Sequence, residues 1–234
     1  MNTIIHDDAM RIISEGIPFE KLYGKTVLIS GANGYVPAYF VHTFVALNDH
    51  KNANIHIIAL CRSRERAESR FSEYMGRDDF EILLQDVCER IDAGRDIHIF
   101  VHAASPAGIR KRHENPVNTF LANVKGAENM LELAKRNPCE YFLFLSSVDI
   151  YGKMNVDDRL REDMLGFLDI LDVRNAYANG NAPPKACAGR IRRNTGFPCL
   201  SSGRSRSSGR GRNWMTAGCT LISYPKSLPI IGLC

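Results

Sequence analysis

Short apolar, β-branched runs alternate with helical patterns along residues 25–146, and this alternation most limits the folds open to the chain. The apolar runs cover residues 25–30, 55–60, 80–84, 97–102 and 141–146, and the helical patterns cover residues 35–47, 64–74 and 117–135. Strands that alternate with helices at this spacing form parallel βαβ units with right-handed crossovers and helices on both faces. The sequence therefore predicts a doubly wound α/β fold within residues 1–180.

Charge divides the chain into two parts. The 234 residues carry a net charge of +4, but no acidic residue follows Asp172, and nine Lys or Arg lie after residue 180. Residues 1–180 hold 21 basic and 26 acidic side chains. With 44% hydrophobic positions, the chain can bury a substantial core. We therefore expect a globular unit at 1–180 and a separate basic tail at 181–234, which is rich in Ser and Gly over residues 201–211.

Membrane and metal partners find no support in the sequence. No apolar run approaches the roughly 20 residues of a membrane span. Asp7 and Asp8 stand where a signal peptide needs basic and then apolar residues. The seven cysteines have no metal-ligand or disulfide spacing. We expect a cytoplasmic protein with no membrane partner and no metal site.

A glycine turn follows the first apolar run directly. In Gly31-x-x-Gly34, the first glycine permits a tight turn and the second lets the backbone approach a pyrophosphate at a helix N-terminus. Pro37 takes the place of the third small residue of the fingerprint, which a first helical turn tolerates. An ordinary strand-to-helix turn is the alternative. The position of the glycine turn directly after the first strand favours a dinucleotide site in a Rossmann-type sheet.

The end of the second strand leaves the form of the dinucleotide open. No Asp or Glu stands there to bind the ribose of NAD. Arg62 and Arg64 stand nearby instead and could accept the 2′-phosphate of NADP. The alternative is that both are solvated charges at the start of a surface helix.

Hydroxyl-bearing residues follow the fifth strand. Ser147 and Tyr177 could meet in one cleft, where the serine holds a substrate oxygen and the phenol exchanges its proton. A phenol with an ordinary pKa of about 10 is a poor base at neutral pH unless a cation lies close to it. We expect that cation one helical turn after the tyrosine. At the end of the fourth strand, His102 is interpreted as a core histidine without a catalytic role.

Taken together in this order, these segments resemble the extended short-chain dehydrogenase/reductase family, the NAD-dependent nucleotide-sugar epimerases, dehydratases and decarboxylases. The resemblance covers about residues 20–180, and its carriers are residues 30–36, 86–87, 102–106, Asn123 with Gly126, residues 146–152 and residues 174–177. It implies that the following residues bind the cofactor: Gly31, Asn33, Gly34, Tyr35 and Val36 at the pyrophosphate, Asp86 and Val87 at the adenine, and Ala103, Ala104, Ser105 and Asn123 along the cofactor. Arg62 is a further cofactor-binding candidate because of its place after the second strand.

The resemblance also implies the chemistry. Tyr177, paired with Ser147, would deprotonate the 4-hydroxyl of a nucleotide sugar while C4 gives a hydride to a tightly held NAD, yielding a 4-keto intermediate. Dehydratases place an aspartate and a glutamate where Val148 and Asp149 stand, and decarboxylases keep only a glutamate at the second position. We therefore expect a dehydratase- or decarboxylase-like enzyme first and an epimerase second. The alternative role for Asp149 is a turn cap. Intact relatives form homodimers.

The family's Tyr-x-x-x-Lys motif is broken at Asn181, where the composition also changes. Residues 181–185 can be written AAC GCG CCG CCG AAG, and one added A gives AAA CGC GCC GCC GAA, which encodes the family's Lys-Arg-Ala-Ala-Glu. Trp214, Met215 and Thr216, read one nucleotide earlier, force two aspartates, and the same frame through Ser223 permits Gly-Arg-Val-Tyr-Ala-Asp-Phe. We hypothesise a one-nucleotide deletion at codon 181.

This hypothesis predicts that the chain lacks the sixth strand and the C-terminal substrate domain, that its tail is poorly ordered, and that this copy is inactive. One alternative treats the tail as genuine. Its arginines, seven between Arg190 and Arg212, would then bind nucleic acid beside a non-catalytic dinucleotide-binding domain. Few aromatic residues lie among them, which makes a nucleic-acid partner the less favoured interpretation. A third interpretation is a cofactor-sensing pseudoenzyme.

Overall fold

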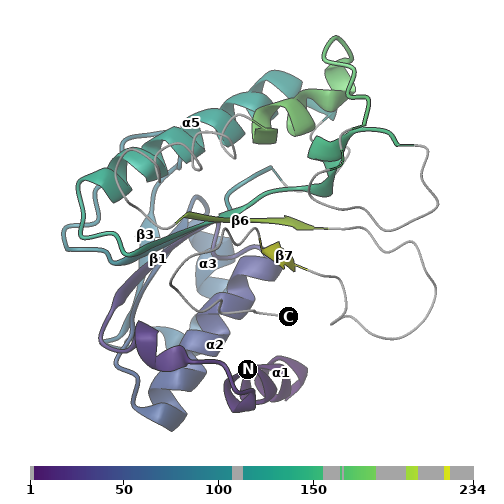
Figure 1. Cartoon of the computed structure of the whole chain (residues 1–234). Helices are drawn as coiled ribbons and strands as arrows, with labels where there is room; N and C mark the ends of the chain where they lie inside the picture. Colours follow the sequence, from purple (N-terminus) through teal and green to yellow (C-terminus); the bar gives the residue numbers. More distant parts are fainter. Residues whose placement is uncertain are drawn as a thin grey trace.

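A computed structural model describes residues 3–106, 113–154, 164, 166–182, 199–204 and 219–221. Helices and strands alternate along the chain up to the fifth strand, except that β4 follows β3 without a helix between them (Figure 1). The elements are α1 (Thr3–Ser14), η1 (Phe19–Leu22), β1 (Thr26–Ser30), α2 (Tyr35–Lys51), β2 (His56–Cys61), α3 (Arg64–Arg70), η2 (Ser72–Tyr74), β3 (Phe80–Leu84), β4 (Ile99–His102), α5 (Pro116–Lys135), β5 (Tyr141–Leu145), η3 (Val148–Tyr151), η4 (Val173–Asn175), β6 (Cys199–Arg204) and β7 (Cys219–Leu221). Residues 176–182 form a further helical segment.

The strands form one sheet in the order β3-β2-β1-β4-β5-β6-β7. All pairs from β3 to β6 are parallel, and the central strand β1 pairs Ser30 with Leu60 of β2 on one side and with His102 of β4 on the other. The chain thus builds outward from β1 in one direction and then returns to build outward in the other. The prediction of a doubly wound, Rossmann-type sheet is confirmed, and its switch point lies between β1 and β4.

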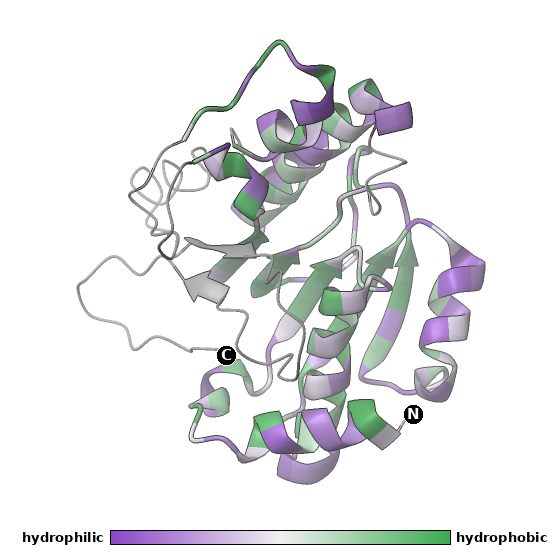
Figure 2. Ribbon diagram, turned by 90° about the vertical axis from the view of Figure 1, so that its right-hand side faces the viewer, coloured by the Kyte–Doolittle hydropathy of each residue, from purple (hydrophilic) through white to green (hydrophobic). Residues whose placement is uncertain are grey.

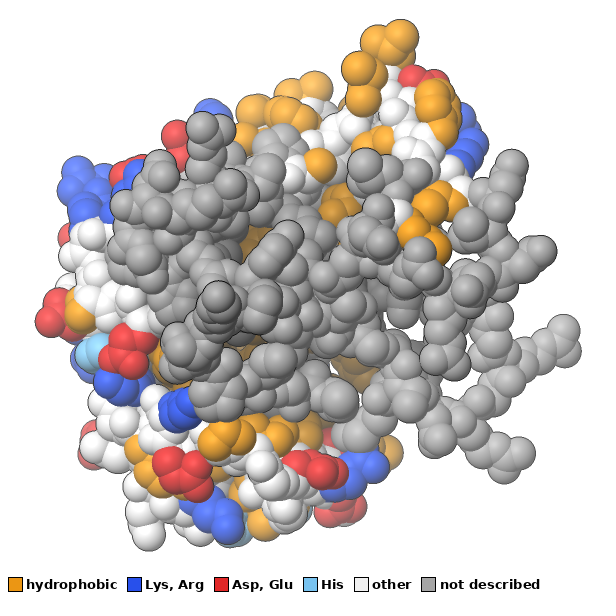
Figure 3. Space-filling model, in the orientation of Figure 1, with side chains coloured by type: hydrophobic (Ala, Val, Ile, Leu, Met, Phe, Trp, Pro, Cys, Tyr) orange, Lys and Arg blue, Asp and Glu red, His pale blue; other side chains and the backbone are white. Residues whose placement is uncertain are grey.

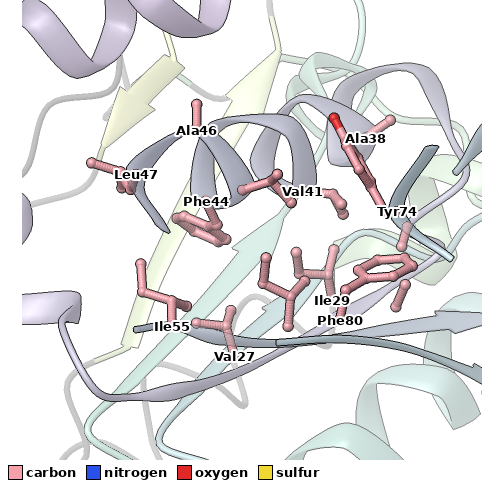
Figure 4. Packing of buried hydrophobic residues seen from close by; sticks show 14 of the residues in the cluster. Val27, Ile29, Ala38, Val41, Phe44, Ala46, Leu47, Ile55, Tyr74 and Phe80 are labelled. Atoms are coloured by element: carbon pink, nitrogen blue, oxygen red, sulfur yellow. The ribbon is translucent and has the colours of Figure 1, made fainter. Parts of the chain in front are cut away.

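Side chains of β1 alternate between two cores, one on each face of the sheet. Val27 and Ile29 pack with α1 and α2, as Figure 4 shows for α2 above the strand. Leu28 faces the opposite way and packs in the cluster that includes Met130 of α5. Figure 2 shows the resulting layers, with largely hydrophobic strands between helices that carry polar residues outward. Both faces are therefore covered, and ligand access is left to the ends of the strands.

Two described segments of the tail, β6 and β7, continue the sheet next to β5. Within the described residues, β6 pairs in parallel with β5, Phe142 opposite Cys199, and β7 pairs antiparallel with β6. Without β6, the outer N–H and C=O groups of β5 would form an open sheet edge, and backbone pairing of such an edge makes few demands on sequence. The rest of the tail, including the arginine-rich stretch, lies mostly outside the described residues.

In the part of the chain that the structure describes, no helix has the length and apolar character needed to cross a membrane. The same residues contain no group of three or more His, Cys, Asp or Glu side chains arranged to hold a metal ion.

Candidate dinucleotide and catalytic site

The glycine turn joins β1 to α2 at the switch point. Gly31 has a φ of +65°, and a Cβ atom there would lie 2.8 Å from Cα of Ala104, just beyond β4. The N–H of Gly31 donates to the carbonyl of Leu60 at 2.9 Å, which ties the turn to β2. Gly34 is the N-cap of α2 and has no capping side chain. The turn therefore exposes backbone at a helix N-terminus, which fits a pyrophosphate.

A buried serine fixes the strand end opposite this turn. Ser30 Oγ lies 2.8 Å from Nδ1 of His102 and accepts hydrogen bonds from the N–H groups of Ala103 and Ala104 at 3.1 and 3.2 Å. Because the hydroxyl accepts from two amides, it donates its proton to Nδ1, and His102 is neutral with its ring proton on Nε2. Burial lowers the pKa of His102 to about 4. The interpretation of His102 as a core histidine agrees with these contacts.

Asn123 of α5 connects the end of β4 to the helix that carries the candidate tyrosine. Its Oδ1 accepts a hydrogen bond from Ser105 Oγ at 2.7 Å, and its Nδ2 donates to the carbonyl of Tyr177 at 3.4 Å. A Cβ on Gly180 would lie 3.2 Å from Cβ of Asn123, so that the two helices approach closely. Asn181, at the position of the family's lysine, is 2% exposed and donates from Nδ2 to the Tyr177 carbonyl at 2.8 Å.

The segment after β5 contains the candidate serine. Ser147 is the N-cap of η3, and its Oγ accepts from the N–H of Asp149 at 3.2 Å. The neighbouring Ser146 Oγ is buried without a hydrogen-bond partner among the described residues. Since β5 lies beside β4, these hydroxyls follow the same edge of the sheet as Ala103 and Ala104. An unsatisfied buried hydroxyl at this edge fits a site that a polar ligand or water completes.

An acidic side chain caps η4, the short helix that directly precedes the helical segment with Tyr177. Asp172 caps η4 by accepting from the N–H of Arg174 at 2.9 Å, and the Arg174 side chain returns to the same carboxylate at 2.7 Å. The hydrogen bond from the Arg174 side chain holds the pKa of Asp172 at about 2. Apolar side chains of this segment are exposed, and Figure 3 shows hydrophobic atoms gathered at this end of the molecule. The exposed apolar side chains of this segment are Phe167, Ile170, Leu171 and Val173.

The residues implied at the adenine lie after β3. Burial raises the pKa of Asp86, but hydrogen bonds from Cys88 and the charge of Arg62 outweigh that effect, and its pKa lies below the usual value. The Arg62 guanidinium lies 3.5 Å from the Asp86 carboxylate. Val87 is buried against α5, and a Cβ on Gly126 would lie 2.9 Å from its Cγ1. Gly126 therefore permits close contact between α5 and this loop.

The structure brings most of the expected residues to one edge of the sheet. Gly31 closely approaches Ala104, Ser105 is bonded to the Asn123 side chain, that side chain is bonded to the main-chain carbonyl of Tyr177, and Arg62 is paired with Asp86. The other expected residues lie at this edge because they directly follow strands of the sheet in the sequence. Asn33, Gly34, Tyr35 and Val36 continue the turn into α2, and Ser147 and Asp149 follow β5. Sequence reasoning missed Ser30, whose role depends on the β1–β4 pairing.

This arrangement defines a dinucleotide-binding α/β class of protein, with a hydroxyl and a phenol as its candidate chemical groups. The sequence model of the NAD dependent epimerase/dehydratase family matches residues 27–180. The chain belongs to that family, as the sequence resemblance indicates.

Relatives within the family carry several names. UDP-glucuronic acid decarboxylase 1 of Danio rerio is 28% identical over 156 residues, which make up 67% of this chain and 35% of the relative. UDP-glucose 4-epimerase of Schizosaccharomyces pombe is 26% identical over 131 residues, or 54% of this chain and 36% of the relative. The chain thus spans about a third of the length of these curated relatives.

Solved structures share the fold. UDP-glucuronic acid 4-epimerase from Bacillus cereus, in complex with UDP-glucuronic acid and NAD, superimposes with a TM-score of 0.59 at 16% identity. That match covers 75% of this chain and 55% of the epimerase. dTDP-glucose 4,6-dehydratase from Bacillus anthracis, in complex with NAD, gives a TM-score of 0.61 at 16% identity over 78% of this chain and 55% of that one.

Proposed function

We propose that residues 3–182 form the cofactor half of a nucleotide-sugar epimerase, dehydratase or decarboxylase. The observation that carries the proposal is the close approach of Gly31 to Ala104, because a side chain at Gly31 would collide with the backbone just beyond β4 and force the turn and the strand end apart. The NAD-bound epimerase and dehydratase structures and the decarboxylase relatives support the same cofactor class and substrate class for the family.

The residues present fit a dinucleotide. The backbone of residues 31–34 would hold the pyrophosphate at the start of α2, and Ala103 to Ser105 would line the opposite wall. A dinucleotide held there would supply a reversible hydride acceptor for the sugar. Asp86 and Val87 would contact the adenine.

The reacting hydroxyl of the sugar would be handled by two side chains. Tyr177 would take its proton, and Ser147 would hold the same oxygen through its own hydroxyl, which already accepts from Asp149 N–H. Asp149 would serve as a carboxylate base in a decarboxylase or dehydratase and needs no role in an epimerase. Because Asp149 lies two residues after Ser147, we place a dehydratase or decarboxylase before an epimerase.

The position of the family's lysine holds no cation in this chain. Asn181 is neutral, buried and bonded to the carbonyl of Tyr177, so it supplies no charge to the phenol. We therefore propose that this copy does not turn over a nucleotide sugar, and that one lost A at codon 181 separates it from an active reading frame. Sequencing the source DNA across this codon tests the second statement directly.

Two proteins test the first statement. The chain as written and the product of the same DNA with one A restored at codon 181 are each given UDP-glucose, UDP-glucuronic acid and dTDP-glucose, and products are followed by NMR. We expect turnover of one of these sugars by the restored product alone, abolished by Tyr177→Phe in that product. Equal turnover by the chain as written, or none by the restored product, would contradict the proposal.

A further inference from the structure

Two Asn–Gly pairs occur in the chain, Asn33–Gly34 and Asn179–Gly180. In such a pair, the main-chain nitrogen of the glycine can attack the side-chain carbonyl carbon of the asparagine, because no Cβ on the glycine blocks the approach. The reaction needs a backbone that can turn and an asparagine side chain that is free to move. The two pairs differ in both respects.

Asn179 and Gly180 are held by a packed helix. Both lie in the helical segment 176–182, and Gly180 is buried. A Cβ on Gly180 would lie 3.2 Å from Cβ of Asn123, so the backbone of this pair packs directly on α5. The Asn179 side-chain amide donates to the carbonyl of Ile170 at 3.5 Å. This pair cannot turn without the loss of helix and of packing.

Asn33 and Gly34 lie in the glycine turn, outside any helix, and both are partly exposed. The Asn33 side chain forms no hydrogen bond in the part of the chain that the structure describes. The N–H of Gly34 makes a single turn bond, to the carbonyl of Gly31 at 2.8 Å, which the reaction has to break. A Cβ on Gly34 would lie 3.1 Å from that carbonyl oxygen, so the turn itself requires a residue without a side chain. The fold thus requires the glycine that makes Asn33 reactive.

We propose that Asn33 is a site of spontaneous deamidation and that this modification abolishes dinucleotide binding. The nitrogen of Gly34 forms a bond to Cγ of Asn33, and the side-chain nitrogen leaves as ammonia. Water then adds to one of the two carbonyls of the cyclic imide and opens the ring at its C–N bond, which gives a carboxylate and a proton. Position 33 becomes aspartate or isoaspartate, depending on the bond that opens. Water is the only co-reactant.

The modification changes the charge where α2 begins, and its effect on binding rests on the dinucleotide-binding function proposed above. Gly34 is the N-cap of α2 without a capping side chain, and the first turn of that helix holds no acidic residue. Free N–H groups and the helix dipole make this end attract an anion. A carboxylate at position 33 would compensate these groups and repel a pyrophosphate, and isoaspartate would also lengthen the main chain before Gly34. The modified chain should therefore stay folded and lose its dinucleotide.

Ageing of the purified full chain in mildly alkaline buffer tests the reaction, because alkali favours the deprotonated nitrogen that attacks. Peptide mass spectrometry follows the conversion of amide to acid at both pairs in one sample. We expect Asn33 to be converted first and Asn179 to remain largely unchanged. In parallel, NAD binding by calorimetry should be lost in step with the converted fraction, while circular dichroism shows an unchanged fold. Conversion of Asn179 as fast as that of Asn33, or full NAD binding by the converted fraction, overturns the proposal.

Asn33→Asp is the diagnostic variant, and Asn179→Asp is its control with the same charge change at the other pair. Asn33→Asp should raise the Kd of NAD about tenfold or more, since placing like charges side by side has this cost, without lowering the unfolding midpoint in urea. Asn179→Asp should leave the Kd of NAD within about twofold. An equal loss of binding in both variants, or unchanged binding in Asn33→Asp, overturns the proposal while leaving the dinucleotide site in place. Failure of the freshly purified parent chain to bind NAD overturns the proposed function itself, and mass spectrometry still measures the conversion of Asn33.

Discussion

Asn181 donates from its side-chain amide to the main-chain oxygen of Tyr177 across 2.8 Å, within the helical segment 176–182. The family's tyrosine has a lysine at this distance along the chain, and here the position holds a buried, neutral group whose donor is used by the helix itself. The bond thus stabilises the local helix and contributes no charge. The chain therefore has the family's tyrosine at position 177, but the residue four positions later carries no positive charge that could activate it.

Asn181→Ala tests the structural part of this relationship. The variant loses a buried hydrogen bond, and we expect the free energy of unfolding to fall by about 1 kcal/mol in urea titrations followed by circular dichroism. Asn179→Ala is a matched control in the same helical segment, because its side chain only reaches the carbonyl of Ile170 at 3.5 Å. Equal losses in both variants would show that the Asn181 bond adds nothing specific.

Gly31→Ala tests the close approach at the switch point. The new methyl group would meet Cα of Ala104 at 2.8 Å and would also strain a φ of +65°. Gly94 has the same φ with nothing within 4 Å, so Gly94→Ala measures the strain alone. We expect Gly94→Ala to cost about 1 kcal/mol of unfolding free energy and Gly31→Ala about 3 kcal/mol. Only Gly31→Ala should also abolish dinucleotide binding in calorimetry, and retained binding would contradict the site.

The strands of the sheet could be predicted because each carries a local apolar signal. β3 covers the expected residues, and β4 begins at Ile99, two residues later than expected. The reason is tertiary, since the N–H of Ile97 donates to the side chain of Asn137 and not to a neighbouring strand. Boundaries of this kind depend on partners far along the chain, which periodicity does not report.

Two elements were not predicted. α1 carries an amphipathic pattern, with Ala9 and Ile13 buried and Met10 and Ile12 partly buried against the core, but it precedes the first strand and so lies outside the alternation of strands and helices. β6 pairs through its backbone with the edge of β5, which leaves little trace in the sequence. The role of Ser30 was missed for a similar reason, because its partners lie more than 70 residues away on β4.

Ser30→Ala tests the fixed turn after β4. The variant removes one acceptor from two N–H groups and the partner of His102 Nδ1, all in a region that is buried or partly buried. We expect a loss of about 3 kcal/mol in unfolding free energy and a higher Kd for the dinucleotide, because Ala103 and Ala104 lose their anchor. Ser14→Ala, which removes an exposed hydroxyl on α1, should change neither. Rescue of both properties by Ser30→Thr would identify the hydroxyl as the cause, and a stable, tightly binding Ser30→Ala would contradict this role.

Acid should destabilise the protein through two buried histidines. Burial lowers the pKa of both His42 and His102 to about 4, below the ordinary value of about 6.5 that applies after unfolding. The unfolded chain therefore binds more protons between these values, and stability that is complete above pH 6.5 is lost as the pH falls toward 4, by up to about 3 kcal/mol for each group. Urea titrations at several pH values should show, near pH 5, a slope that corresponds to uptake of about two protons on unfolding.

The matched variants assign that slope. His42→Gln removes one of the two groups, so the slope near pH 5 should fall by about one proton even where the variant is less stable at every pH. His50→Gln replaces an exposed histidine of the same helix and should leave the slope unchanged. Burial keeps His42 neutral, its Nδ1 lies within hydrogen-bond distance of the Tyr74 hydroxyl at 2.6 Å, and its Nε2 is buried without a partner among the described residues. A slope that is the same in His42→Gln and in the parent chain would show that His42 is protonated as easily in the folded state as in the unfolded one.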